Sequence, residues 1–175
     1  MKVLNEAYFK AKYLGSLTAY KLTLTYDIVH AVNIVDRRVV IRDGVIVYKS
    51  KIQEKGFNYP FQLGNGVKFD DPSVAHEITV TVRTGFMIVM STDGLFDNAH
   101  DIEFEKLACN GQADLHELGT FSKILARKIA EYALQNSEMK SIYTLFSIDC
   151  LKVGKDGAGG MSDDITVIVA LIFPR

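Results

Sequence analysis

The sequence feature that most constrains the fold is a pair of β-branched runs on either side of Asp43-Gly44. Val39-Val40-Ile41-Arg42 precedes this dipeptide and Val45-Ile46-Val47-Tyr48 follows it. Glycine tolerates the positive φ that a two-residue hairpin turn needs, and β-branched side chains favour an extended backbone. We therefore expect a β-hairpin here, so the fold must contain an antiparallel sheet.

Other segments show strand or helix periodicity. Strands are expected over 17–26, 29–35, 77–83, 86–90 and 165–173, with 77–83 and 86–90 joined as a pair through Thr84-Gly85. Apolar residues at helical spacing predict helices over 3–14, 101–109 and about 117–140. The sum is a single strand-rich α+β domain covering residues 1–175.

Composition narrows the classes of function. Twenty Lys and Arg against 21 Asp and Glu give a net charge of -1, so net charge does not favour nucleic-acid binding. The apolar run from Ile165 to Phe173 is far shorter than the ~20 residues of a membrane helix, so no transmembrane segment is expected. Cys109 and Cys150 are interpreted as two reduced, buried thiols in a reducing compartment in preference to a disulfide.

Asp93 and Asp163 lie where loops meet buried strands. Asp93 follows the strand 86–90, and Asp163 precedes the strand 165–173. If these strands are antiparallel neighbours, both carboxylates meet at one end of the sheet, where oxygen ligands would suit Mg²⁺ or Mn²⁺. The alternative is that Asp93-Gly94 forms a turn and that Asp163 or Asp164 caps a loop.

The segments around these aspartates resemble a known family. Ser91-Thr92-Asp93-Gly94-Leu95-Phe96-Asp97-Asn98 and the later Gly159-Gly160-Met161-Ser162-Asp163-Asp164-Ile165-Thr166 are similar to the two C-terminal signatures of the metal-dependent type 2C protein serine/threonine phosphatases, the PPM family. Val40-Ile41-Arg42-Asp43-Gly44 and Phe57-Asn58-Tyr59-Pro60-Phe61 resemble its mitochondrial, Ptc-seven-like branch. The resemblance implies a β-sandwich flanked by helices, with Asp93 and Asp163 as metal ligands.

Departures from the family pattern predict a loss of catalysis. The N-terminal segment with the carboxylate that bridges two metals has no counterpart, so the expected fold is an incomplete α-β-β-α sandwich that lacks its N-terminal strands and helix. Ile34-Val35-Asp36-Arg37 stands where the family has Leu-Gly-Asp-Ser. Two carboxylates cannot hold two ions that repel each other at ~4 Å. We therefore expect no catalytic residues and no cofactor, or at most one weakly bound Mg²⁺ or Mn²⁺.

The leading hypothesis from the sequence is a pseudophosphatase that acts as a structural subunit. Apolar strand faces such as Val80 with Val82, or Ile88 with Met90, would lack their usual cover, so other protein subunits are expected to cover the exposed sheet. The branch it resembles implies an intracellular, mitochondrial location.

Two alternatives remain open at this point. One is an active Mn²⁺- or Mg²⁺-dependent protein serine/threonine phosphatase whose site is completed by a missing segment or by a partner chain. The other is a binding module that holds phosphoproteins without hydrolysing them, which would require a basic pocket.

Overall fold

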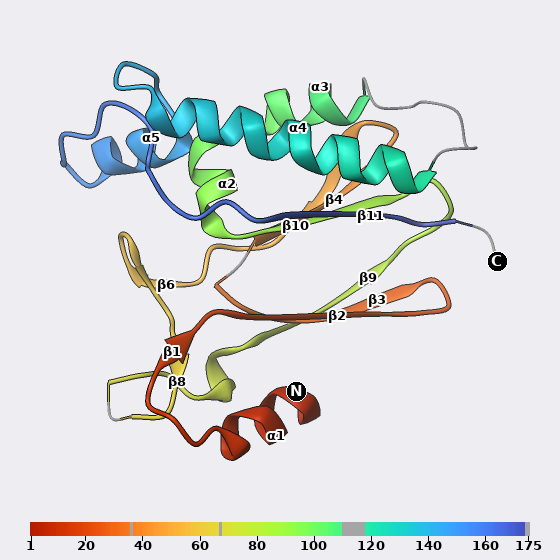
Figure 1. The fold of residues 1–175 in the computed structure, drawn as a ribbon, viewed down its shortest axis with the longest axis vertical. Helices are drawn as coiled ribbons and strands as arrows, with labels where there is room; N and C mark the ends of the chain where they lie inside the picture. Colours follow the sequence, from red (N-terminus) through yellow and green to blue (C-terminus); the bar gives the residue numbers. More distant parts are fainter. Residues whose placement is uncertain (36, 67, 110–117, 174–175) are drawn as a thin grey trace. The chain divides into compact units, whose positions relative to one another are not determined.

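The computed structural model describes residues 1–35, 37–66, 68–109 and 118–173 (Figure 1). The chain divides into two compact units, the first formed by residues 1–36 with 52–82 and the second by 37–51 with 83–175. Each is described below by itself. The prediction that residues 1–175 make a single domain stays a prediction.

The first unit contains a three-stranded antiparallel sheet in the order β2-β3-β9, a helix and short strand pairs. Its elements are α1 (Lys2–Lys10), β1 (Ser16–Leu17), β2 (Ala19–Thr25), β3 (Ile28–Ile34), β6 (Glu54–Gly56), β7 (Tyr59–Pro60), β8 (Leu63–Gly64), the 3₁₀ turn η1 (Pro72–Val74) and β9 (His76–Thr81). The first helix is shorter than predicted: it ends at Lys10, and the apolar side chains of Tyr13 and Leu14 are exposed. Because these two side chains are almost fully exposed, burial of apolar surface does not stabilise a further helical turn here.

The described residues of the second unit form a four-stranded sheet in the order β11-β10-β4-β5 and four helices. Its elements are β4 (Arg37–Arg42), β5 (Val45–Lys49), β10 (Met87–Ser91), α2 (Asp93–Asn98), α3 (Asp101–Cys109), α4 (Leu118–Glu138), α5 (Leu145–Lys152) and β11 (Val167–Leu171). Figure 1 shows α4 lying along β10 and β11. The mixed helix and sheet fold confirms the α+β prediction.

The predicted hairpin is present as β4 and β5. Arg42 pairs with Val45, so Asp43 and Gly44 form the turn, and their φ angles are 50° and 76°. Both angles lie in the left-handed region that a type I′ turn requires. A local sequence signal therefore determined this part of the sheet.

Two other sequence predictions are corrected by the topology. Strand β9 does not pair with β10: β9 pairs with β3 in the first unit, whereas β10 lies between β4 and β11 in the second. Thr84-Gly85 is thus a connection between units and not a hairpin turn. The helices α2 and α5 were not predicted, because each is only two turns or less and carries little helical periodicity.

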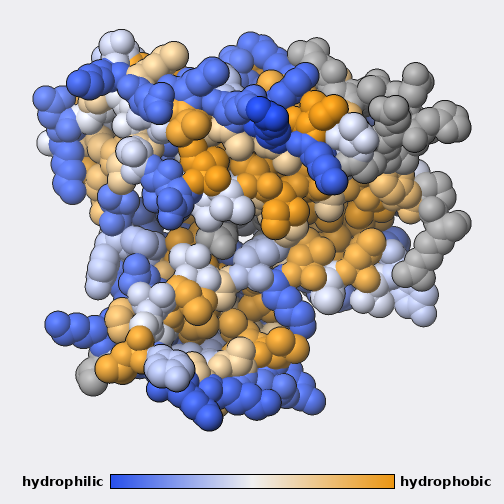
Figure 2. Space-filling model, viewed as in Figure 1, coloured by the Kyte–Doolittle hydropathy of each residue, from blue (hydrophilic) through white to orange (hydrophobic). Residues whose placement is uncertain are grey.

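The core of the second unit lies between its helices and one face of its sheet. The predicted apolar face of the long helix is confirmed: Leu125, Ile129 and Ala133 are buried together with Met87 and Val89 of β10. In Figure 2 hydrophilic residues cover the outer side of the helical layer, at the top of the view, and hydrophobic residues gather beneath it. Burial of this kind stabilises a domain by about 25 cal/mol per Å² of apolar surface.

The strand faces predicted to be exposed are not exposed throughout. Val82 has an exposed fraction of 0% and Ile88 of 1%, and Val80 and Met90 are half-buried. The uncovered apolar surface from which partner subunits were inferred is therefore absent at Val82 and Ile88. The partner prediction itself stays untested.

The family departure at Val35 coincides with an unusual backbone conformation. Val35 has a φ of 79°, which is costly for a β-branched residue, and it stands where the family pattern has glycine. Its amide donates a hydrogen bond of 2.7 Å to Oε1 of Gln53, and its side chain packs with Ile34 and Leu63. The neighbouring Asp36 of the same motif lies outside the described residues.

The aromatic segment 57–61 is held by a lysine and not by apolar contacts alone. The ammonium of Lys55 lies 5.4 Å from the ring centre of Tyr59 and 5.5 Å from that of Phe61, and 2.8 Å from Oδ1 of Asp70. The hydrogen bond to Asp70 raises the pKa of Lys55 above its ordinary value. Burial by itself would raise the pKa of Asp70, but the hydrogen bonds from Lys55 and from the Gln62 amide hold it lower than usual. Lys55 thus ties the aromatic segment to Asp70.

Candidate functional site

The two strands that carry the predicted site are antiparallel neighbours. Strand β10 pairs with β11 from Met87 opposite Leu171 to Ser91 opposite Val167. The end of β10 and the start of β11 therefore lie at the same edge of the sheet. This confirms the condition under which the sequence placed Asp93 and Asp163 together.

Asp93 is the first residue of α2, which begins directly after β10. The turn that the sequence left open as an alternative at Asp93-Gly94 is not present, because the structure has a helix of six residues here with Thr92 as its N-cap. The Asp93 side chain is half-buried, and its Oδ1 accepts a hydrogen bond of 3.2 Å from the Gly94 amide. A carboxylate in the first turn of a helix is favoured because the exposed amides there carry partial positive charge.

Residues 154–162 form a glycine-rich loop. Asp163 lies in the extended link between this loop and β11. Its side chain is exposed, and its Oδ1 accepts a hydrogen bond of 2.7 Å from the Asp164 amide. A Cβ placed on Gly94 would lie 3.3 Å from the Cβ of Asp163 and 2.7 Å from the carbonyl oxygen of Asp164. The backbones of α2 and of the link are thus in contact one residue after Asp93. The tertiary structure brings Asp93 and Asp163 into one neighbourhood.

We call the segments 92–98 and 161–166 the aspartate junction. Thr92 joins them at the sheet edge: its Oγ1 donates to the Asp164 carbonyl at 2.7 Å and accepts from the Thr166 amide at 3.0 Å. The Thr92 amide also donates to the Thr166 carbonyl at 3.2 Å. One threonine therefore holds both the residue after Asp163 and the residue that leads into β11.

Asn98 joins the same two segments at the other end of α2. Its Nδ2 donates to the Gly94 carbonyl at 2.8 Å and to the Met161 carbonyl at 2.7 Å, and its Oδ1 accepts from the Met161 amide at 2.9 Å. The sequence pattern indicates no role for Thr92 or Asn98. The signal that could have found Asn98 is its position four residues after Gly94, on the same side of a helix.

The aspartate junction has the type of ligand that a hard divalent cation prefers, but too few of them. Two carboxylates and nearby backbone carbonyls are oxygen ligands of the kind that Mg²⁺ and Mn²⁺ prefer. Among the described residues, however, no group of three or more His, Cys, Asp or Glu side chains is placed to hold a metal ion. Asp93 and Asp163 can therefore supply two ligands of a larger set.

Histidines and cysteines are further types of metal ligand, and those described here have other surroundings. The His100 ring donates from Nε2 to the Tyr143 carbonyl at 2.7 Å, which gives it a structural partner at the start of α3. His116 lies outside the described residues. Cys109 and Cys150 are both free thiols, as predicted; Cys150 is buried, but Cys109 is exposed, which corrects the expectation that both are buried.

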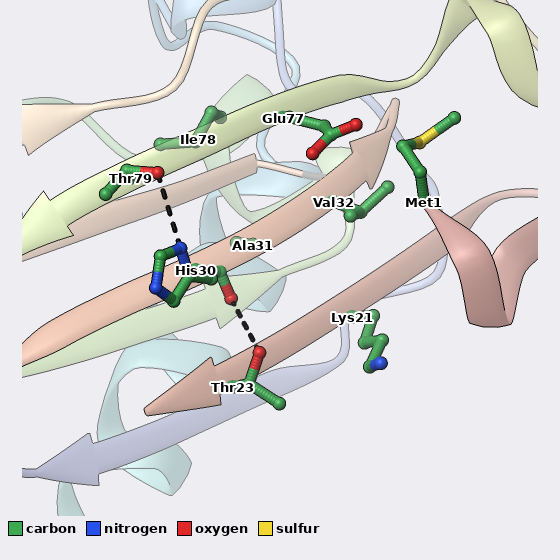
Figure 3. Close-up of a pocket in the computed structure, with 9 residues that line it drawn as sticks. All are labelled: Met1, Lys21, Thr23, His30, Ala31, Val32, Glu77, Ile78 and Thr79. Atoms are coloured by element: carbon green, nitrogen blue, oxygen red, sulfur yellow. Dashed lines mark hydrogen bonds between the residues drawn. The ribbon is translucent and has the colours of Figure 1, made fainter. Parts of the chain in front are cut away.

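A separate cavity of about 280 Å³ lies over the sheet of the first unit, as Figure 3 shows. Thr23 donates to the His30 carbonyl at 3.3 Å, and the hydroxyl of Thr79 lies 3.5 Å from Nδ1 of His30. Lys21 and Glu77 bring one charge of each sign to its lining. The cavity contains none of the predicted metal ligands and is not the basic pocket that a phosphate-binding module requires.

The close approach of Gly94 to the link predicts the effect of one substitution. In Gly94→Ala the new methyl group would lie 2.7 Å from the Asp164 carbonyl oxygen, so the backbone of 163–164 must shift. We expect a loss of about 1–2 kcal/mol in the free energy of unfolding, because overpacking outweighs the better helix propensity of alanine. Denaturant unfolding of the purified protein measures it.

Gly56→Ala is the matched control, because nothing lies within 4 Å of a Cβ at that position. It should leave stability unchanged within about 0.5 kcal/mol. A Gly94→Ala protein as stable as the wild type would show that the two segments do not approach closely.

The helices of the described residues include none that is long and apolar enough to cross a membrane.

No protein-family model matches the chain. Curated proteins do match it. This chain is 35% identical over 173 residues to "Probable protein phosphatase 2C 55" of Arabidopsis thaliana, and the match covers 98% of this chain and 36% of the relative. It is 32% identical over 177 residues to "Protein phosphatase PTC7 homolog" of Homo sapiens, covering 93% of this chain and 56% of the relative. The chain thus spans little more than a third of the plant relative and about half of the human one.

Solved structures agree with these relatives. The photosystem II phosphatase PBCP matches with a TM-score of 0.87 and 26% identity, over 98% of this chain and 70% of that chain. The catalytic domain of the serine threonine protein phosphatase PstP, solved in complex with two manganese ions, matches with a TM-score of 0.55 and 15% identity, over 91% of this chain and 60% of that chain. The second likeness shows a shared fold.

These relatives correct one sequence prediction. The expectation of a protein that is not an enzyme is contradicted, because the curated relatives and the solved neighbour at 26% identity are phosphatases by name. The expectation rested on ligands that the 175 residues do not contain. Since the chain spans only part of each relative, ligands missing from it are no evidence against activity.

Proposed function

The chain belongs to the type 2C protein phosphatase family, and from this premise we propose that it forms part of an active, Mn²⁺- or Mg²⁺-dependent protein serine/threonine phosphatase. In this proposal the site of Asp93 and Asp163 is completed by a further segment or by a partner chain. The observation that carries the proposal is the contact of Gly94 with Asp163 and Asp164, which brings the two signature segments together.

The donor set supports a divalent cation at the junction. Asp93 is half-buried and Asp163 is exposed, so one carboxylate is held within the fold and the other faces solvent. When bound, a divalent cation supplies the positive charge that activates water and stabilises the developing charge of phosphoester hydrolysis. Because the catalytic domain of PstP was solved with manganese ions, Mn²⁺ is the metal to add in the hydrolysis assay.

The residues of this chain have defined tasks in the proposal. Asp93 and Asp163 supply negative charge that lowers the cost of bringing cations close to each other. Thr92 keeps the link beside Asp93 through its hydrogen bonds to the backbone of Asp164 and Thr166. Thr92 does not need to touch substrate for this task.

The need for completion follows from ligand number. A two-ion site binds its ions through more carboxylates than the two found here, and the described residues contain no group of three or more candidate ligands. The relatives are longer than the matched part, so a further segment of that kind is one source. A partner chain is the other.

The proposal also includes a location for the protein, in mitochondria. It is supported by the resemblance to the Ptc-seven-like branch and by the relatives named PTC7 homolog. Imaging of the intact protein with a fluorescent tag placed at its C-terminus tests it, and a signal outside mitochondria would contradict it.

The test of the activity is phosphopeptide hydrolysis with Mn²⁺ and with a chelator. The protein is assayed alone and after addition of a polypeptide that carries the part of a PTC7 homolog which this chain does not match. Mn²⁺-dependent release of phosphate in either case supports the proposal, and the added polypeptide tells whether completion is needed. No release in either case, from protein that unfolds cooperatively, overturns it.

A further inference from the structure

Asn98 uses every hydrogen-bonding group of its side-chain amide. The side chain has an exposed fraction of 0%, its two donated bonds reach Gly94 and Met161, and its oxygen accepts from Met161. Both backbone groups of Met161 are thus paired to one side chain, as they would be to a neighbouring strand. A buried amide satisfied in this way fixes the position of its partner, because any shift leaves buried polar groups unpaired.

Asn98 is itself anchored to the long helix. The backbone carbonyl of Asn98 accepts a hydrogen bond of 2.8 Å from Nδ2 of Asn136, which is also buried. Gly160, the residue before Met161, also lies against α4: a Cβ on Gly160 would lie 2.1 Å from the backbone carbonyl oxygen of Asn136. Residues 160 and 161 are therefore held against both α2 and α4.

Asp163 lacks a comparable anchor of its own. Its side chain is exposed, and the hydrogen bond to its Oδ1 comes from the adjacent Asp164 amide. The position of Asp163 is therefore determined by the hydrogen bonds made by the residues before and after it. Thr92 holds Asp164 and Thr166 after it, and Asn98 holds Met161 before it.

We propose that Asn98 is a positioning residue that sets the placement of Asp163 relative to Asp93 for binding a divalent cation. It acts through the Met161 backbone and touches neither the cation nor the substrate. The inference rests on the proposed function, because it concerns the metal affinity of the same site. Partners that orient metal ligands typically change metal affinity by 10- to 100-fold when they are removed.

The experiment compares Asn98→Leu with Leu125→Ala. Leucine has the same branched arrangement of heavy atoms as asparagine, with larger end groups, and makes no hydrogen bonds, so it releases Met161. Leu125 is buried in the same core cluster as Leu95 and Phe96 but makes none of the hydrogen bonds that hold Met161, so its truncation destabilises the fold without releasing Met161. Direct Mn²⁺ binding is measured by electron paramagnetic resonance, and the Mn²⁺ concentration for half-maximal hydrolysis is measured separately, on the protein completed as in the activity assay.

We expect Asn98→Leu to weaken Mn²⁺ binding 10- to 100-fold and to raise the half-maximal Mn²⁺ concentration by a similar factor, with less change in the rate at saturating Mn²⁺. Leu125→Ala should leave both metal values within about twofold of the wild type, although it unfolds more readily. If Asn98→Leu does not fold, Asn98→Ala replaces it, because its smaller side chain leaves room for a water to pair with Met161.

Each outcome has a distinct meaning. Wild-type Mn²⁺ binding in the Asn98 variant overturns the inference and leaves the proposed function intact. Equal weakening in the Asn98 and Leu125 variants also overturns it, because the effect would then be one of stability. Mn²⁺ binding by the wild type without hydrolysis overturns the proposed function alone, and a wild type that binds no Mn²⁺ overturns the inference.

Discussion

Asp93→Asn should lower Mn²⁺-dependent phosphopeptide hydrolysis by about 10³-fold at saturating substrate. The substitution removes one negative charge from the aspartate junction while keeping the shape of the side chain. The Asn oxygen can still accept the hydrogen bond that Asp93 takes from the Gly94 amide, so the start of α2 should stay folded. Steady-state rates and thermal unfolding of the same preparations measure the two effects separately.

Asp156→Asn is the matched control for this prediction. Asp156 is exposed in the glycine-rich loop, outside the aspartate junction, and its replacement makes the same change of charge. Its turnover should stay within about twofold of the wild type. An Asp93→Asn protein that keeps more than a tenth of wild-type turnover would mean that Asp93 does not contribute to the catalytic centre.

Gly160→Ala should cost about 3 kcal/mol or more in the free energy of unfolding, a large effect for a single methyl group. A Cβ at this position would lie 2.1 Å from the Asn136 carbonyl oxygen and 2.4 Å from the Ser137 Cα, both backbone atoms of α4. A helix backbone cannot rotate out of the way as a side chain can, so the loop that leads to Asp163 must move instead.

Urea denaturation with an unchanged m-value measures this loss. Gly15→Ala serves as the control, because a Cβ at Gly15 meets nothing within 4 Å. A Gly160→Ala protein that unfolds at the wild-type midpoint would show that the loop does not pack against the end of α4.

The hairpin at Asp43-Gly44 and the long helix could be predicted because their signals are local. The turn needs two residues with positive φ, and α4 needs an apolar face at helical spacing; both are patterns of adjacent residues. The strands β10 and β11 and the metal-ligand candidates at their ends were found in the same way. The pairing of β9 with β3 could not be predicted, because strand partners depend on side chains far apart in the sequence.

The residues that hold the site were harder to find than the candidate ligands. A carboxylate at the end of a strand stands out in a sequence, whereas Asn98 gives no sign that its amide will meet Met161, 63 residues later. The predicted loss of activity failed for a different reason. It used the absence of ligands from 175 residues as evidence, although the relatives extend well beyond the matched part.

By itself, the sequence determined the α+β class, the hairpin, the long amphipathic helix and the two aspartates of the signature segments, since each depends on the identity and spacing of neighbouring residues. Only the tertiary structure decided that Asp93 and Asp163 share one edge of a sheet and that Thr92, Asn98 and Gly160 hold the link between them. The physical reason is that close packing and buried hydrogen bonds join atoms that are distant along the chain, and these contacts exist only once the sheet and helices have come together.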